Sequence, residues 1–107
     1  MKPSVNLERV VDGKRYRVAT ATLLASDAYW DGHNFERQGR NTYLYRSPRG
    51  GYFAVHLTMW QGEQDRLEQD RLEPLTEDEA RELYEGALTE HEVTYEAAFP
   101  GVAVEDA

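Results

Sequence analysis

The sequence predicts an α+β domain in which an antiparallel β-meander is packed by one main helix, at about residues 76–86. Three observations lead to this fold class. An Asp-Gly pair joins two strand-like segments near the start, apolar and polar residues alternate through residues 52–60, and a helix-start signal stands at Thr76. At 107 residues the chain can bury one core, so a single domain over residues 1–107 is expected.

The first two strands are expected at about residues 5–11 and 14–25. Asp12 and Gly13 lie between them and supply the positive φ angles of a two-residue type I′ turn. The second segment is rich in Val, Thr and Tyr, which suit a pleated surface. Its end leaves two alternatives open, because residues 19–28 also suit a helix.

Residues 26–41 predict a long loop, since large aromatic residues lie there among polar residues and glycines. Long ordered loops often carry function. After it, residues 41–60 predict a hairpin around turn-forming residues 47–51. Strand alternation places Phe53, Val55, Leu57 and Met59 on the core face, and Tyr52, Ala54, His56, Thr58 and Trp60 on a semi-polar, aromatic face. That second face, which Arg46 can join, could bind a planar or anionic ligand, but a packing face covered by the 26–40 loop is the favoured interpretation.

The helix has its start specified by a capping box, with Thr76 as N-cap and Glu79 three residues on. Its apolar stripe is expected to comprise Ala80, Leu83, Tyr84 and Ala87. Gly86 predicts its end. A short strand near residues 92–95, a turn at residues 100–101 and a frayed tail after about residue 101 complete the expected order.

The charge is unevenly distributed along the chain. The net charge is −8, but residues 1–62 hold nine Lys/Arg and five Asp/Glu, whereas residues 63–107 hold three and fifteen. Such asymmetry marks either an interaction surface or two solvated faces. Cysteine is absent, which excludes disulfides and cysteine-based zinc sites. No apolar run is long enough to span a bilayer and the first residues lack a signal-peptide core, so a cytoplasmic location is expected.

The pentad Glu-Gln-Asp-Arg-Leu occurs twice in succession, at residues 63–67 and 68–72. Its two leucines are five apart, so they lie about 140° apart on a helix and on opposite faces of a strand. The copies therefore cannot use their leucines alike within one regular element. We predict that the second copy runs as strand into the helix cap with Leu72 buried, and that residues 63–68 form an exposed, mobile excursion.

Several of these stretches together resemble a family of small, uncharacterised bacterial proteins often carried by mobile elements. The stretches are "VDGKRY", "TATLLASD", "YLYRSPRGGYF" and "LEPLTEDEARELYE", within residues 10–85. In the related pattern only one pentad unit separates "WQGE" from "LEPLT". The resemblance implies a fold and a bacterial, cytosolic setting, and no particular activity.

The candidate site residues lie in the 26–41 loop and on the hairpin. Asp31, His33 and His56 are weak catalytic candidates, because such a set can move protons or bind a metal. A turn at Asp31 whose aromatic neighbours anchor the loop is the better interpretation. The predicted binding residues are Tyr29, Trp30, His33, Tyr43, Tyr45, Arg46, Tyr52, His56 and Trp60. No phosphate loop, nucleophile elbow or paired zinc-ligand motif is present, so neither a cofactor nor a metal is predicted.

Three function hypotheses follow. The first is a non-enzymatic protein-binding domain, in concrete form a regulatory or anti-defence inhibitor carried by a mobile element, with a protein partner of unknown identity. The second is a metal- or small-molecule-dependent enzyme at the 29–36 loop. The third is a single-strand nucleic-acid binder that uses Tyr43, Tyr45, Arg46 and Tyr52, although the acidic net charge makes nucleic acid an unfavourable partner. The oligomeric state is open, because an exposed strand edge can pair two copies.

Overall fold

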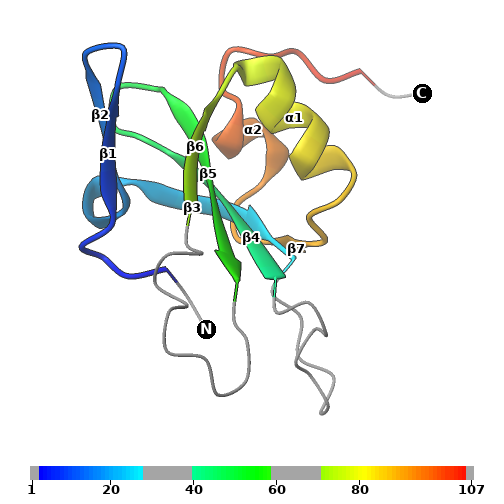
Figure 1. Cartoon of the computed structure of the whole chain (residues 1–107). Helices are drawn as coiled ribbons and strands as arrows, with labels where there is room; N and C mark the ends of the chain where they lie inside the picture. The colour runs from blue at the N-terminus through cyan, green and yellow to red at the C-terminus, as the bar shows by residue number, and fades with distance from the viewer. Residues whose placement is uncertain (1–2, 28–39, 59–70, 106–107) are drawn as a thin grey trace.

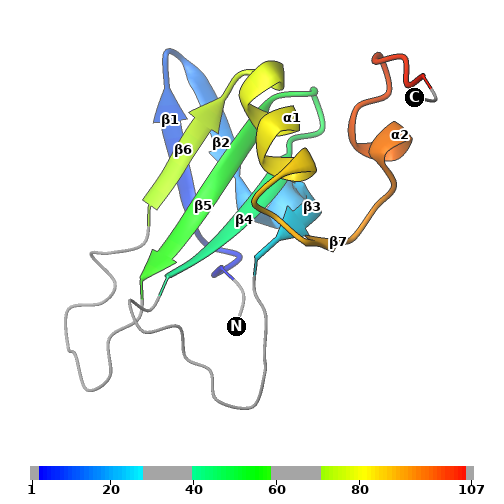
Figure 2. The same ribbon diagram turned by 90° about the vertical axis from the view of Figure 1, so that its right-hand side faces the viewer.

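The chain folds as three layers: a two-stranded ribbon, a five-stranded antiparallel sheet, and two helices on the far side of that sheet (Figure 1, Figure 2). The computed structural model describes residues 3–27, 40–58 and 71–105. In chain order the elements are β1 (Glu8–Val11), β2 (Lys14–Arg17), η1 (Val18–Thr20), β3 (Thr22–Ser26), β4 (Arg40–Arg46), β5 (Tyr52–Thr58), β6 (Arg71–Leu75), α1 (Glu77–Glu85), β7 (Glu90–His91) and α2 (Tyr95–Ala98). The strand order of the larger sheet is β6-β5-β4-β3-β7. The predicted α+β fold with a meander and one main helix is confirmed.

The ribbon begins the chain as predicted. Val11 pairs with Lys14 across the turn, and Asp12 and Gly13 adopt φ angles of 52° and 77°. These are the positive values that a type I′ turn requires.

The prediction of one continuous strand over residues 14–25 is wrong, and so is the helical alternative for its end. The 3₁₀ turn η1 interrupts the segment, so that β2 belongs to the ribbon and β3 to the large sheet. Within this turn Val18 donates its backbone N–H to the carbonyl of Leu7 and becomes buried. Burial of Val18 between the two sheets thus overrides the strand propensity of the segment.

The β4–β5 hairpin is confirmed together with its turn. Ser47 accepts two hydrogen bonds within the turn. The Gly50 N–H donates to the Ser47 carbonyl, and the Gly51 N–H donates to the Ser47 hydroxyl. Gly50 has a φ of 91°, which favours glycine. The pairing then runs from Arg46 with Tyr52 to Arg40 with Thr58.

Both faces of this hairpin are buried, which agrees with the packing role favoured for its second face. Phe53, Val55 and Leu57 pack under the ribbon, as predicted. On the opposite face Tyr52 and Ala54 are also buried, because α1 and α2 cover them. The packing role therefore holds at Tyr52, whereas His56 is only partly buried.

The helix cap is confirmed in atomic detail. The Glu79 N–H donates to the Thr76 hydroxyl at 3.1 Å, and the Thr76 N–H donates to the Glu79 carboxylate at 2.8 Å. Gly86 is the C-cap. Ala80 and Tyr84 are buried against the sheet and Leu83 is half-buried, but Ala87 lies beyond the helix and is exposed.

The segment after α1 differs from the prediction. The strand is β7, two residues earlier than expected, where Glu90 and His91 pair with β3. Thr94 then caps α2 by accepting from the Ala97 N–H, which brings Phe99 into the core with no exposed surface. The short helix was missed because its cap, four residues and aromatic anchor give no full helical period.

Other predictions concern segments at the margins of the described residues. Leu72 is buried in β6, as predicted. The 26–41 loop is described only at Asp27 and in β4, and the expected excursion at residues 63–68 lies outside the described residues, so both stay predictions. Val102 still packs on the core, and residues 103–105 are exposed. Among the described helices, none has the length and apolar character needed to cross a membrane.

Candidate functional site

The predicted binding residues are divided between the undescribed segments and the two faces of the hairpin. Four predicted binding residues and one catalytic candidate lie outside the described residues. They are Tyr29, Trp30, His33 and Trp60, and Asp31. Of the others, Tyr43 and Tyr45 lie on the ribbon side, and Arg46, Tyr52 and His56 lie on the helix side. The structure therefore does not bring the described candidates together on one surface.

The three tyrosines belong to the core. Tyr43, Tyr45 and Tyr52 are 1%, 5% and 6% exposed, and the Tyr45 ring stacks on Phe53 with 5.2 Å between ring centroids. Burial raises the pKa of Tyr43 and of Tyr45 to about 12. The Tyr52 hydroxyl donates to the Ala98 carbonyl at 2.9 Å. A stacking platform needs exposed ring faces, which these three residues do not offer.

His56 is the predicted candidate that keeps access to solvent, and it joins two polar side chains. Its Nδ1 lies 3.2 Å from the Thr42 hydroxyl and its Nε2 lies 3.0 Å from a carboxylate oxygen of Glu73. The imidazole is 28% exposed and the Glu73 side chain 52%. Thr42 is the cross-strand partner of His56, and Glu73 lies diagonally across β6, so all three project from the helix-side face.

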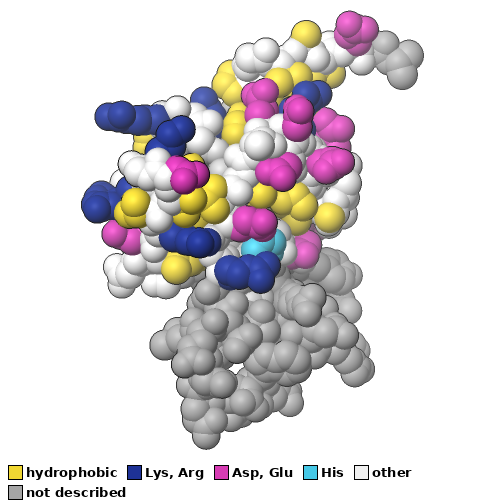
Figure 3. Space-filling model, turned by 45° about the horizontal axis from the view of Figure 1, so that its top comes forward, with side chains coloured by type: hydrophobic (Ala, Val, Ile, Leu, Met, Phe, Trp, Pro, Cys, Tyr) yellow, Lys and Arg dark blue, Asp and Glu magenta, His cyan; other side chains and the backbone are white. Residues whose placement is uncertain are grey.

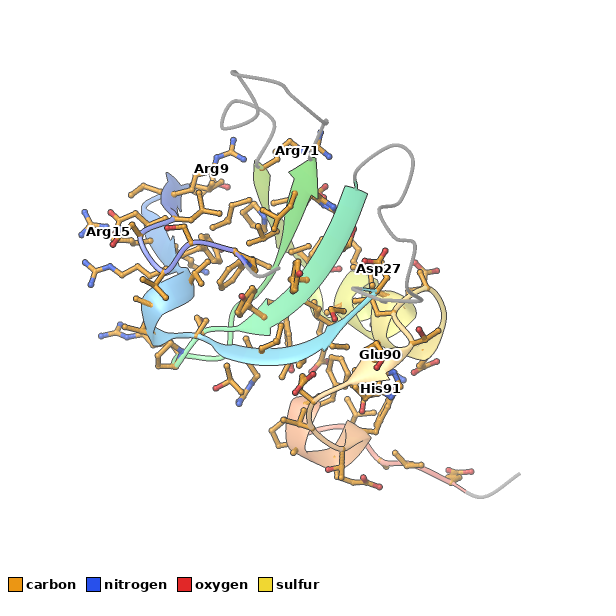
Figure 4. All side chains as sticks on the ribbon, turned by 90° about the horizontal axis from the view of Figure 1, so that it is seen from below. Arg9, Arg15, Asp27, Arg71, Glu90 and His91 are labelled. Carbon is orange, nitrogen blue, oxygen red and sulfur yellow. The ribbon has the colours of Figure 1, made fainter. Side chains whose placement is uncertain are left out.

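Two charged residues extend this group along the same end of the sheet. Asp27 follows β3 and accepts the Thr42 N–H at 2.7 Å, while its own N–H donates to the Thr42 carbonyl. Arg71 is the partner of His56 on β6. Figure 4 shows Arg71 at the β6 edge and Asp27 at the end of β3, with β4 and β5 between them. We call Asp27, Thr42, His56, Arg71 and Glu73 the polar row.

The polar row places a hydroxyl, an imidazole and a carboxylate in series. A neutral imidazole with its hydrogen on Nε2 accepts from Thr42 and donates to Glu73, which is the order that activates a hydroxyl nucleophile. Acyl transfer also needs N–H donors aimed at the developing oxyanion. The Thr42 N–H is instead bound to the Asp27 carboxylate, whose charge would repel an oxyanion. The geometry thus suits holding or moving a proton, and it does not suit acyl transfer.

The third histidine of the chain, His91, lies on β7, far from His56. It stacks on Tyr84 with 3.9 Å between centroids, and its Nε2 donates to the carbonyls of Tyr84 and Leu88 near the end of α1. Figure 4 shows it beside Glu90 at the β7 edge of the sheet. Three strand spacings separate β7 from β5, or about 14 Å. Within the described ranges no three His, Asp or Glu side chains are grouped so as to hold a metal ion.

A second candidate surface covers the outer side of α1. Its carboxylates are Glu77, Asp78, Glu79, Glu82 and Glu85, which we call the acidic helix face. All five are exposed, and Figure 3 shows Asp and Glu gathered over this part of the molecule. Arg81 is the single basic residue of α1, and it lies 3.7 Å from Asp78 and 4.0 Å from Glu85.

The sequence contained part of the signal for the polar row. The turn at residues 47–51 fixes the register of the hairpin, and that register makes Thr42 the partner of His56. Glu73 and Arg71 could not be assigned in this way. The register of β6 depends on a connection over residues 59–70, which no turn motif defines.

No family model, curated protein or solved structure matches this chain. Function is therefore inferred from the geometry, and the resemblance to a mobile-element family stays an expectation.

Proposed function

We propose that the protein is a small non-enzymatic domain that binds a basic surface of a partner protein through the acidic helix face. The observation that supports this proposal most directly is the division of α1. Its inner side buries Ala80 and Tyr84 against the sheet, and its outer side carries five exposed carboxylates with one arginine. Contacts within the fold involve the inner side, the Glu79 cap, and Asp78 and Glu85, which pair with Arg81. They leave the side chains of Glu77 and Glu82 without a hydrogen bond or ion pair among the described residues.

The carboxylates are arranged along the helix rather than scattered. Asp78, Glu82 and Glu85 follow an i, i+4, i+7 stripe that spans about 10 Å. A fixed row of like charges produces a local field that steers a cationic partner and orients it. Nucleic acid would be repelled by the same field, which agrees with the net charge of −8.

A regulatory or anti-defence inhibitor in a bacterial cytoplasm is the biological form that we propose. An acidic helix can occupy the basic cleft of a nucleic-acid-binding protein, because both interactions depend on the same cationic side chains. This role needs no cofactor. It also agrees with the burial of Tyr52 under the helices, which leaves charge as the main feature of the described helix-side surface.

Affinity capture from a bacterial host lysate tests this proposal when it is combined with charge variants. The test variant is Glu77→Gln with Glu82→Gln, and the matched control is Glu92→Gln with Glu105→Gln, which removes the same charge from exposed positions outside α1. We expect a basic protein to be retained at low salt by the wild type and the control, and to be lost at high salt and by the test variant. Equal retention by both variants would refute the proposal, and retention of the chain on heparin or oligonucleotide would favour the nucleic-acid hypothesis.

The polar row supports a second candidate, a metal- or small-molecule-dependent enzyme. The supporting observation is the Thr42–His56–Glu73 hydrogen-bond series, which lies where the 28–39 segment leaves β3 and enters β4. Titration with Zn²⁺ or inorganic phosphate, followed through the NMR signals of the His56 imidazole, tests it. Shifts that disappear in Glu73→Gln would support binding at the polar row, and unchanged signals would reject this candidate for these ligands.

A further inference from the structure

The β1–β2 ribbon presents a second charged surface on the opposite side of the sheet. Arg9 and Tyr16 point inward, since the Arg9 guanidinium donates to the Leu72 carbonyl at 2.8 Å and the Tyr16 ring meets Phe53 edge-on. Strand alternation then turns their neighbours outward. We call these outward residues the ribbon face: Glu8, Val10, Arg15 and Arg17. Figure 4 shows Arg15 pointing away from the large sheet.

The ribbon face is preorganised for binding. The turn at Gly13, the hydrogen bond from Arg9 to β6 and the one from the Val18 N–H to the Leu7 carbonyl fix the ribbon at both ends and along its inner side. A fixed backbone lowers the entropic cost of association. Val10 is 55% exposed on this face, where it lies opposite Arg15 and diagonally from Arg17 on the neighbouring strand. Arginine is enriched in protein interfaces, and an exposed apolar side chain beside it adds apolar contact area.

The charges of the ribbon face favour a protein partner over nucleic acid. Glu8 lies 3.6 Å from Arg17 and 3.9 Å from Arg15, so a carboxylate stands among the cations and would repel phosphate. All three side chains are about half exposed. Exposed ion pairs contribute little stability, so the arginines can exchange Glu8 for carboxylates of a partner at small cost.

We propose that the ribbon face of one copy docks on the acidic helix face of a second copy of this chain. The two surfaces complement each other in charge and lie on opposite sides of the sheet (Figure 1, Figure 3). The contact is therefore heterologous, and it joins copies head to tail into open rows or closed rings instead of symmetric pairs. The inference rests on the acidic helix face being a binding surface, as proposed above. The ribbon face is small, so the association is weak and depends on salt.

Sedimentation equilibrium over a concentration series tests this inference. In 50 mM NaCl we expect the average mass of the wild type to rise with concentration, and in 500 mM NaCl we expect the association to be at least about tenfold weaker. Arg15→Glu with Arg17→Glu should abolish the association, and so should Glu77→Lys with Glu82→Lys. Neither variant should associate alone, but an equal mixture of the two should, because each supplies the charge that the other has lost. Circular dichroism verifies that each variant is folded.

A matched control separates local docking from the effect of net charge. Lys14→Glu with Arg49→Glu makes the chain four charges more negative, as the ribbon variant does, at exposed positions outside the ribbon face. This control should associate like the wild type. The helix variant makes the chain four charges less negative, so repulsion by net charge alone would predict stronger association, whereas docking predicts its loss.

Three results would overturn the inference: a wild type that stays monomeric at low salt up to millimolar concentration, a mixture of variants that does not associate, or a control that loses association as fully as the ribbon variant. These results differ from failure of the proposed function. Capture of a basic partner by a monomeric wild type would leave the proposed function standing and remove this inference. Self-association of the wild type without capture of any basic partner would leave this inference standing and remove the proposed function.

Discussion

Two tyrosines in the hairpin should respond in opposite ways to substitution by phenylalanine. Tyr52 and Tyr43 are both almost fully buried, and each substitution to Phe removes one hydroxyl and leaves the ring in place. The Tyr52 hydroxyl donates to the Ala98 carbonyl at 2.9 Å. The Tyr43 hydroxyl has no hydrogen-bond partner among the described residues. Tyr52→Phe should therefore destabilise the fold, and Tyr43→Phe should stabilise it or leave it unchanged.

The magnitudes follow from the hydroxyl partners. Tyr52→Phe loses a buried hydrogen bond and leaves the carbonyl of Ala98 unpaired, which lowers the free energy of unfolding by about 1 to 3 kcal/mol. Tyr43→Phe removes the cost of burying an unpaired hydroxyl, a gain of up to about 1 kcal/mol. The two variants should therefore differ by about 1 to 4 kcal/mol.

Urea denaturation followed by far-ultraviolet circular dichroism measures this difference. With a urea m-value of about 1 to 3 kcal/mol/M, the unfolding midpoints of the two variants should lie at least about 0.3 M apart, on opposite sides of the wild type or with Tyr43→Phe close to it. Equal destabilisation by both substitutions would refute the reasoning, because it would show that the Tyr43 hydroxyl is bonded in the folded protein.

Three further predictions concern the buried tyrosines, the helix cap and the repeated pentad. The pKa values of Tyr43 and Tyr45 are raised from 10 to about 12 in the folded protein. Their stabilising contribution is therefore complete below pH 10 and is lost as the pH rises through 12. Urea melts should give a free energy of unfolding that is lower at pH 11 than at pH 9 by about 1.4 kcal/mol for each tyrosine. Equal values at the two pH values would contradict this. Thr76→Ala removes the capping box and should cost about 1 kcal/mol in the same assay, and no loss would mean that the cap is not formed in solution. Deletion of residues 63–67 should leave a cooperative thermal transition, and loss of cooperativity would show that the first pentad is structural.

Features encoded within a few residues were predictable from the sequence. The Asp12–Gly13 turn, the hairpin turn after Ser47 and the capping box at Thr76 are all present where they were expected. Each depends on backbone conformations that few residue types accept, so local sequence decides them.

Features that depend on distant contacts were not predictable. The break at Val18 exists because that side chain packs between two sheets, and Tyr52 is buried because α2 arrives from a segment more than forty residues later, where the Ala98 carbonyl accepts its hydroxyl. Only part of the polar row was predictable from the sequence. The hairpin register joins Thr42 to His56, but Glu73 reaches His56 only through the pairing of β6 with β5.

The burial of the hairpin aromatics and the charge asymmetry of the chain have a common origin in the three-layer architecture. A chain of 107 residues that fills two interfaces, one on each face of its sheet, needs its large rings inside, which is where Tyr43, Tyr45 and Tyr52 lie. Under the proposed function, the outer layers then supply the surfaces for partners. Those layers come from opposite ends of the chain, with the basic ribbon from the first half and the acidic helix from the second. The change in sign along the sequence therefore becomes a separation of charge across the sheet, which two docking surfaces of opposite charge require.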